Sequence, residues 1–351
     1  MGLTAGNLIN GVKARADATK VIAFGNTAIV KDNSGEKASN TVIAHKDCGA
    51  PIGLFDSGIG GLSVYLHLAQ QLPAERYIYY ADTLNVPYGS RDSDDIEALT
   101  LTAVEWLCEQ GCKLIVIACN SASAYALEAA RRRYPQVPIV GLVPALKPAV
   151  LASKSGRVAV LATKATLNGT LLNDVIDNFA TPNRTVVTKY FDPQLVPWVE
   201  AGMPEQHDTA LCLRQQLQNF ANDGIDQLVL GCTHYPFFRA FLLDEIAQQQ
   251  LPMQVVDSGQ AIAERVKQLL LTNKMLATNQ RSAFLDDGTD NRCVDNSRTD
   301  SNHAEISSAA SMAIIRPPLT FYATKYDERL AFLIERLLGK ETILQYRSKQ
   351  R

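Results

Sequence analysis

Two cysteines stand in the same local context, each after an apolar run and before polar residues. Cys119 follows LIVIA, and Cys232 follows QLVLG about one small domain further along the chain. Short unbroken apolar runs are typical of parallel strands that are buried on both faces. Both cysteines are therefore predicted to lie at the carboxyl ends of strands, where open α/β sheets bind their ligands.

A thiol at such a strand end could exchange a proton with a bound substrate. A cysteine pKa near its ordinary value of about 8.5 makes thiol and thiolate both accessible, and the N-terminus of a helix predicted over Ala124 to Arg133 favours the thiolate of Cys119. Asn120, Ser121 and Ser123 are candidate caps for that helix. The alternative is that Cys119 is a small buried hydrophobic residue, as free cysteines often are. The second strand-end cysteine favours the catalytic interpretation.

Two further polar residues near strand ends are candidate acid/base helpers. Asp56 follows the apolar run PIGLF, and His234 lies two residues after Cys232. Each also has a structural interpretation, Asp56 as a turn former and His234 as a buried histidine. Beside a strand-end thiol, each becomes a candidate to hold or transfer a proton.

The glycine-rich stretch DSGIGG supports a rival interpretation. It lies between a predicted strand and a predicted helix, and Asp82 ends the next strand, which approximates a dinucleotide-binding fingerprint. Ser63 stands where the third glycine is expected, and no lysine completes a P-loop. A nucleotide-dependent oxidoreductase therefore remains an alternative from a different class, as does a binding module without catalytic activity.

Composition narrows the class of partner. The 351 residues carry a formal net charge of -2, so we expect neither nucleic acid nor a membrane as a partner. The seven cysteines are an odd number without a dense framework, which favours reduced thiols and a cytoplasmic location. Cys108 and Cys112 lack companion ligands, so the pair is predicted to pack in the core and we expect no metal. No apolar run has membrane-spanning length, and no secretory signal is evident.

Predicted strands and helices alternate along the chain, which indicates α/β architecture with parallel sheets. Residues 1–49 are polar and poor in aromatic residues, so we predict a disordered N-terminal extension. Residues 272–312 are rich in Ser, Asn, Asp and Thr and are predicted to form a flexible insertion. The strands are predicted at PIGLF, Tyr77–Ala81, LIVIA, Pro138–Val143, RVAVLAT, Val186–Phe191, QLVLG, 254–256 and LTFYAT.

Eight motifs in order resemble the glutamate racemases of the aspartate/glutamate racemase family, which act without pyridoxal phosphate in bacterial cell-wall synthesis. They are DSGIGGLSV, ADTLNVPYGSR, ACNSASA, GLVPALKPA, LATKAT, VPWVEAG, LGCTHYP and VDSGQAIA. The resemblance covers about residues 50–270 and 319–340. It implies two parallel-sheet α/β domains related by pseudo-symmetry, with the active site in the cleft between them. The implied first domain comprises 50–121 and 234–345, and the second comprises 122–233.

The resemblance also assigns roles to individual residues. It implies that Cys119 and Cys232 are the catalytic acid/bases, with Asp56 supporting the first and His234 and Glu200 supporting the second. Substrate-binding positions are implied at Asp56, Ser57, Tyr88, Gly89, Asn120, Ser121, Thr163, Thr166, Thr233 and His234.

Three positions depart from the family pattern. Ser121 replaces the usual threonine, Ala165 stands where glycine is common, and Asp192 replaces a frequent cysteine. None of these changes removes a catalytic group, although each could alter substrate affinity.

The implied reaction is the cofactor-independent interconversion of L- and D-glutamate, which supplies D-glutamate for peptidoglycan precursors. Inverting an α-carbon requires one acid/base group on each face, a task for which two facing cysteines are suited. Without a pyridoxal lysine, the site must stabilise a carbanion with preorganised donors and exclude water. An aspartate or hydantoin racemase is the nearest alternative. We expect a homodimer, with a cell-wall precursor as a candidate regulator.

Overall fold

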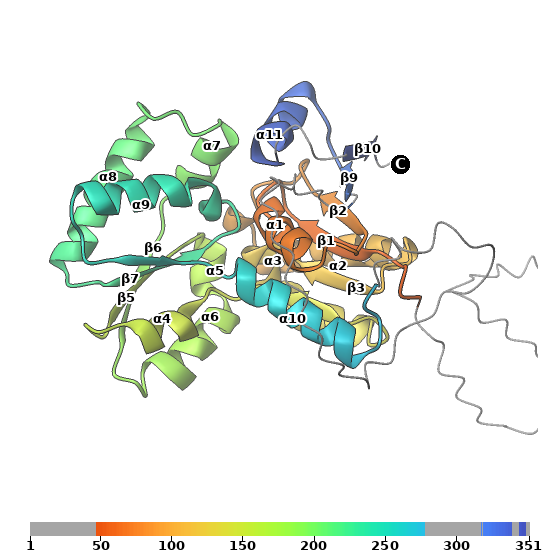
Figure 1. The fold of residues 1–351 in the computed structure, drawn as a ribbon, viewed down its shortest axis with the longest axis horizontal. Coiled ribbons are helices and arrows are strands. Elements are labelled where there is room, and N and C mark those ends of the chain that lie inside the picture. The colour runs from red at the N-terminus through yellow and green to blue at the C-terminus, as the bar shows by residue number, and fades with distance from the viewer. Residues whose placement is uncertain (1–46, 278–316, 318, 339–343, 349–351) are drawn as a thin grey trace, which may run out of the picture. The chain divides into compact units, whose positions relative to one another are not determined.

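The structure is a computed structural model that describes residues 47–277, 317, 319–338 and 344–348. The predicted N-terminal extension, 1–49, lies outside the described residues except for its last three, and the predicted insertion, 272–312, lies outside them from residue 278 onward. The described chain contains two parallel β-sheets flanked by helices (Figure 1). The predicted α/β fold class with parallel sheets is therefore confirmed.

The larger sheet has six strands in the order β10-β9-β2-β1-β3-β4, and every neighbouring pair is parallel. Asp56, the last residue of β1, lies opposite Ala81 of β2, and Phe55 lies opposite Ile117 of β3. This register brings Asp56, Asp82 and the residues after β3 to one edge of the sheet. The strand bounds are β1 Ile52–Asp56, β2 Tyr77–Ala81, β3 Leu114–Ile117, β4 Ile139–Gly141, β9 Leu319–Ala323 and β10 Leu344–Ser348.

Helices cover both faces of this sheet, because alternate strand residues point to opposite faces. Leu54, Tyr79 and Val116 pack in one core cluster with the buried faces of three helices: α1 Leu62–Gln71, α10 Gly259–Thr272 and α11 Glu328–Leu338. Phe55 and Ile117 pack on the other face with α2 Ser93–Glu109 and α3 Asn120–Arg133. Cys108 and Cys112 are buried in that second cluster, which confirms their predicted core packing.

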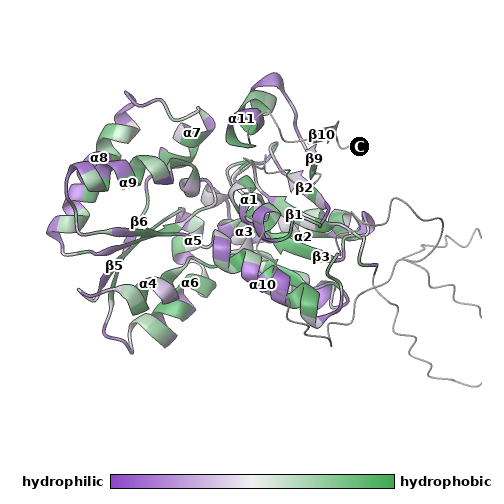
Figure 2. Ribbon diagram, viewed as in Figure 1, coloured by the Kyte–Doolittle hydropathy of each residue, from purple (hydrophilic) through white to green (hydrophobic). Residues whose placement is uncertain are grey.

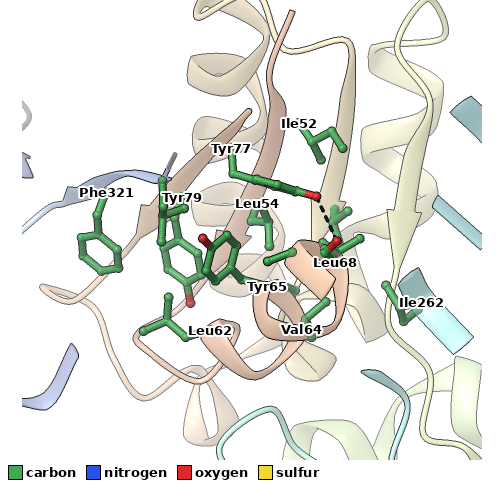
Figure 3. Packing of buried hydrophobic residues seen from close by; sticks show 14 of the residues in the cluster. Ile52, Leu54, Leu62, Val64, Tyr65, Leu68, Tyr77, Tyr79, Ile262 and Phe321 are labelled. Atoms are coloured by element: carbon green, nitrogen blue, oxygen red, sulfur yellow. Dashed lines mark hydrogen bonds between the residues drawn. The ribbon is translucent and has the colours of Figure 1, made fainter. Parts of the chain in front are cut away.

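Tyrosines of the first cluster keep their hydroxyl groups hydrogen-bonded inside the core, as Figure 3 shows for Tyr77 and the carbonyl of Leu68 at 3.1 Å. Tyr79 stacks on Phe321, with ring centroids 5.0 Å apart, and its hydroxyl donates to the carbonyl of Gly58 at 3.0 Å. Because Gly58 belongs to the glycine-rich turn, the core directly supports the loop that follows β1.

The smaller sheet has four parallel strands in the order β6-β5-β7-β8. One face packs against α7 Leu195–Glu200, α8 Asp208–Asn222 and α9 Arg239–Gln248, and the other against α4 Leu146–Ala152 and α6 Thr170–Val175 (Figure 1). The strand bounds are β5 Arg157–Ala162, β6 Val186–Tyr190, β7 Gln227–Gly231 and β8 Gln254–Val256.

Sheet membership differs from the predicted domain boundaries. β4 pairs with β3 in the larger sheet and α3 packs against α2, although both β4 and most of α3 fall within 122–233. β8 pairs with β7 in the smaller sheet, although it lies beyond residue 234. The chain thus changes sheet between β4 and β5, and returns after β8, where α10 packs against α1. The boundaries near 122 and 234 do not follow the sheets, because a strand's local sequence does not encode which sheet it joins.

Hydropathy follows this layering. Figure 2 shows apolar strands in both sheets and amphipathic helices such as α10, which carry both apolar and polar residues. Among the residues that the structure describes, no helix is both long enough and apolar enough to span a bilayer.

Candidate active site

Cys119 lies directly at the N-terminus of α3, two residues after β3 ends. The helix begins at Asn120, four residues earlier than predicted, so the predicted caps lie inside it. Cys119 is itself the cap, because its Sγ accepts a hydrogen bond from the backbone N–H of Ala122 at 3.5 Å. Ser57 Oγ lies 3.6 Å from the same sulfur.

Burial dominates the protonation of Cys119, which is only 5% exposed. Desolvation and, less strongly, the nearby Asp56 carboxylate raise the pKa of this thiol to about 12, although hydrogen bonds from Ala122 and Ser57 oppose the shift. The N–H of Ala122 at the helix N-terminus favours the thiolate, as predicted, but burial has the larger effect and favours the thiol. The helix supplies a hydrogen bond, but it does not compensate the loss of water around the sulfur.

Cys232 follows β7 and begins a chain of three side chains. Its Sγ lies 3.8 Å from His234 Nδ1, and His234 Nε2 lies 3.2 Å from Glu200 Oε1. Glu200 is the last residue of α7, so the carboxylate reaches the imidazole from a separate element. The structure thus brings Glu200 to Cys232 and His234, although it lies 34 residues before His234 in the sequence.

His234 is 3% exposed, and burial by itself disfavours its imidazolium form. Hydrogen bonds and charge interactions with Cys232 and Glu200 outweigh burial and raise the pKa of His234 well above its ordinary value. The charged imidazolium is consequently the form that this arrangement stabilises beside Cys232.

Asp56 connects the two strand ends. It is fully buried, and burial raises the pKa of its carboxyl group, while His234 and hydrogen bonds oppose that shift. Its Oδ2 accepts from the N–H of Gly58 at 2.9 Å, and its Oδ1 accepts from Thr233 Oγ1 at 3.3 Å. Because Asp56 ends a strand of the larger sheet and Thr233 follows a strand of the smaller one, this bond joins residues of both sheets at the site.

The glycine-rich turn serves the site by making room for side chains. A Cβ on Gly60 would lie 2.5 Å from both His234 Nδ1 and Thr233 Oγ1, and one on Gly58 would lie 3.3 Å from Glu200 Oε1. Cβ atoms in proteins do not approach other atoms as closely as 2.5 Å. Only glycine therefore fits at position 60 unless neighbouring atoms move. This steric role accounts for the glycines that had suggested a dinucleotide fingerprint.

Three hydroxyl groups form a second polar cluster. Ser121 Oγ lies 2.9 Å from Thr163 Oγ1, which lies 3.0 Å from Thr166 Oγ1. Thr163 also caps α5, Lys164–Asn168, by accepting from the N–H of Thr166. A Cβ on Gly89 would lie 2.8 Å from Thr163, so the Tyr88–Ser90 turn packs closely against this cluster.

The Tyr88 hydroxyl is not part of this cluster, because it donates a hydrogen bond to Asp82 Oδ2 at 2.6 Å. Asn120, by contrast, is buried with a side-chain Nδ2 that has no hydrogen-bond partner among the described residues. It lines a small cavity together with Cys232 and Thr233. An unpartnered buried donor beside a thiol is suited to a substrate carboxylate.

Sequence reasoning did not identify two supporting residues, Ser63 and Tyr79. Ser63 Oγ donates to the carbonyl of Thr233 at 2.9 Å, and Tyr79 supports the turn through Gly58. Ser63 had been noted only as the residue that replaces a third glycine.

Among the residues that the structure describes, no group of three or more His, Cys, Asp or Glu side chains is arranged to hold a metal. Five described cysteines are free, as predicted, namely Cys108, Cys112, Cys119, Cys212 and Cys232. Cys48 is disulfide-bonded, so the prediction of reduced thiols is wrong for this residue.

Comparisons with known proteins agree on one family. The family model for Asp/Glu/Hydantoin racemase matches residues 52–266. A glutamate racemase from Deinococcus radiodurans is 47% identical over 232 residues, which are 66% of this chain and 79% of that protein. One from Clostridium perfringens is 38% identical over 237 residues, which are 68% of this chain and 89% of that protein.

Solved structures show the same similarity. Glutamate racemase from Francisella tularensis in complex with D-glutamate has a TM-score of 0.66 and 26% identity, covering 86% of this chain and 98% of that one. The Escherichia coli enzyme in complex with L-glutamate and the activator UDP-MurNAc-ala has a TM-score of 0.62 and 28% identity, covering 85% of this chain and 98% of that one.

Proposed function

Because the chain belongs to the Asp/Glu/Hydantoin racemase family, we propose that it interconverts L- and D-glutamate through two cysteines, Cys119 and Cys232, without a cofactor. The observation that carries this proposal is the pairing of two strand-end thiols from different sheets around one buried polar site. Cys232 lies close enough to influence the pKa of Cys119 through its charge. An α-carbon between the two sulfurs would meet an acid/base group on each face.

In this mechanism the thiolate of Cys232 removes the α-proton of L-glutamate, and the thiol of Cys119 donates a proton to the opposite face. The electron pair of the broken C–H bond forms the new one, so each turnover leaves Cys232 protonated and Cys119 deprotonated. D-glutamate reacts in reverse. His234 favours the Cys232 thiolate as an imidazolium partner, with Glu200 holding the ring.

Substrate recognition falls to the buried donors around the two thiols. The hydroxyl groups of Ser57 and Thr233, the amide of Asn120 and the N–H groups at the start of α3 can bind the carboxylates of the substrate, and Asp56 its ammonium group. The cluster of Ser121, Thr163 and Thr166 would bind the second carboxylate, with the turn at Tyr88 and Gly89 closing against it.

In the cell this reaction would supply D-glutamate for peptidoglycan precursors in the cytoplasm. The activator named for the Escherichia coli structure, UDP-MurNAc-ala, makes a cell-wall precursor a candidate effector here as well. We further propose that the functional form is a homodimer.

Incorporation of solvent deuterium at the α-carbon tests the proposed function. The protein is incubated in D₂O with L-glutamate, D-glutamate or L-aspartate, and deuterium and configuration are measured by NMR and chiral chromatography. We expect exchange and inversion with both glutamates, and neither with the Cys119→Ala/Cys232→Ala variant. Exchange with aspartate alone would instead indicate an aspartate racemase, and binding of glutamate without exchange would indicate a binding module.

A further inference from the structure

The C-terminal helix α11 contacts the helix that carries Glu200. Arg329 Nη2 donates a hydrogen bond to the backbone carbonyl of Glu200 at 3.2 Å. Arg336, two turns further along α11, lies against Gly202 in the turn that follows α7, because a Cβ on Gly202 would lie 2.6 Å from Arg336 Nη1. The buried residues of α11 belong to the core of the larger sheet, whereas α7 belongs to the core of the smaller one. Two arginines of one helix thus contact the end of a helix from the other sheet.

The geometry of α7 explains why this carbonyl is available. The chain leaves the helix through Gly202, whose φ is +87°, and the N–H groups of Ala201, Gly202 and Met203 bond to carbonyls of residues before Glu200. The carbonyl of Glu200 is left at the negative end of the helix, where a cationic donor is favoured. Arg329 supplies such a donor.

The Glu200 side chain is only partly enclosed by its neighbours. It is 30% exposed and lines a cavity with Val86, Pro197, Arg329 and Leu333, among others. The position of this partly exposed carboxylate relative to His234 depends on where the end of α7 lies. Glu200 therefore accepts a hydrogen bond from Arg329 at its backbone carbonyl and contacts His234 with its carboxylate.

We propose that Arg329 is a positioning residue for proton transfer at Cys232, acting through the end of α7, Glu200 and His234. The inference rests on the proposed function, because it assigns Arg329 to the half of the reaction that Cys232 performs. Arg329 touches neither cysteine, so its influence should be confined to the side of the site that Glu200 serves.

The test uses elimination from L and D enantiomers of a glutamate analogue with a leaving group on its β-carbon, which needs only the abstracting base. In the full chain, Arg329→Gln should slow elimination from the L analogue by about threefold to tenfold, the size of a helix-end charge interaction, and leave the D analogue unchanged. Arg329→Lys should recover part of the loss. Arg132→Gln, which removes an exposed arginine on α3, is the matched control and should affect neither enantiomer.

A double-mutant cycle separates positioning from general destabilisation. If Arg329 acts through Glu200, Arg329→Gln should add little to Glu200→Gln, whereas independent effects would multiply. Equal losses from both enantiomers, or fully multiplicative losses, would overturn the inference. Wild-type protein that eliminates from neither enantiomer would overturn the proposed function as well, so the two failures are distinguishable.

Discussion

Cys119 and Cys232 occupy equivalent strand ends but have different immediate partners. Cys119 caps a helix of 14 residues and contacts a serine hydroxyl, with no histidine in hydrogen-bonding contact in the part of the chain that is described. Cys232 is followed by a short 3₁₀ helix, Tyr235–Phe238, and has the imidazole of His234 beside it. The strand end places each sulfur in the site, whereas the hydrogen-bond partners differ between the two.

This difference assigns opposite roles to the two sides before substrate binds. Burial raises the pKa of Cys119, which keeps it as a thiol, and the raised pKa of His234 keeps an imidazolium beside Cys232. Under the proposed mechanism, a Cys119 thiol on one side and an imidazolium beside Cys232 on the other would suit abstraction of the α-proton of L-glutamate by Cys232. Because the equilibrium constant of racemisation is unity, kcat/KM must be equal in both directions. The asymmetry can therefore appear only in half-reactions such as elimination from each enantiomer of the analogue.

The largest effect is expected from the cysteines themselves. Replacing either with alanine should reduce racemisation by about a thousandfold or more, because one face then lacks its acid or base. Serine can still donate a proton but is a far poorer base, so Cys119→Ser should impair elimination from the D analogue and Cys232→Ser from the L analogue. Elimination rates measured on each enantiomer decide this. Equal impairment by both serine variants on both enantiomers would show that each face does not have its own cysteine.

His234→Asn should produce the next largest effect, about a hundredfold slower elimination from the L analogue, because Cys232 loses its imidazolium partner. The D analogue should lose less than about tenfold, since the contacts of Cys119 with Ala122 and Ser57 remain. Circular dichroism and the thermal midpoint control for misfolding. An equal loss on both enantiomers would mean that His234 serves the whole site rather than one cysteine.

Local sequence pattern predicted the elements well where it was strong. The strands Tyr77–Ala81 and 254–256 were predicted with the bounds that the structure has. The short helices α4 and α5 were not predicted, because they span at most about two helical turns and carry little periodicity, and the edge strand β10 was not predicted either. The sheet that β4 and β8 join could not be predicted either, since that choice depends on packing between distant segments.

The features of the site also divide into those that follow from local sequence pattern and those that depend on contacts between distant residues. Strand-end placement of Asp56, Cys119 and Cys232 follows from local pattern. The contact of Asp56 with Thr233 joins residues far apart in sequence and was not predicted, since the family resemblance implied only that each of them binds substrate. For Cys119 the sequence predicted the contribution of the helix N-terminus but not the larger, opposite effect of desolvation, which depends on the assembled core. Ser63 and Arg329 carried no local signal of a role in the site.

Gly60→Ala, in the glycine-rich turn, tests the difference between Cys119 and Cys232. Its Cβ would overlap His234 and Thr233, so about a tenfold to hundredfold loss is expected, mainly with the L analogue. Overpacking should also destabilise the protein by about 1–3 kcal/mol. Elimination rates and urea unfolding of Gly60→Ala and of wild type measure both effects. Full activity in the variant would show that the turn can shift without cost to His234.

The two half-reactions should also differ in pH dependence. Elimination from the D analogue requires loss of a proton from Cys119, whose pKa is raised to about 12, so its rate should increase about tenfold per pH unit from neutral pH towards pH 10. Elimination from the L analogue should increase less steeply, because the raised pKa of His234 maintains the imidazolium beside Cys232. Rate profiles between about pH 6 and pH 10 test this. Parallel profiles would contradict the assignment of different protonation states to the two sides.

The smallest expected effect belongs to Ser57→Ala, which removes the side-chain hydroxyl beside Cys119 Sγ. This hydroxyl opposes the rise in the pKa of Cys119, so its loss should raise that pKa further and slow elimination from the D analogue by about threefold to fivefold. The pH profile for the D analogue should shift to higher pH, because less thiolate is present at any given pH. The L analogue is the internal control, and its profile should keep its shape, since Ser57 has no hydrogen bond to Cys232 or His234 in the described chain. A uniform loss on both enantiomers without a pH shift would mean that Ser57 only binds substrate and does not adjust the thiol.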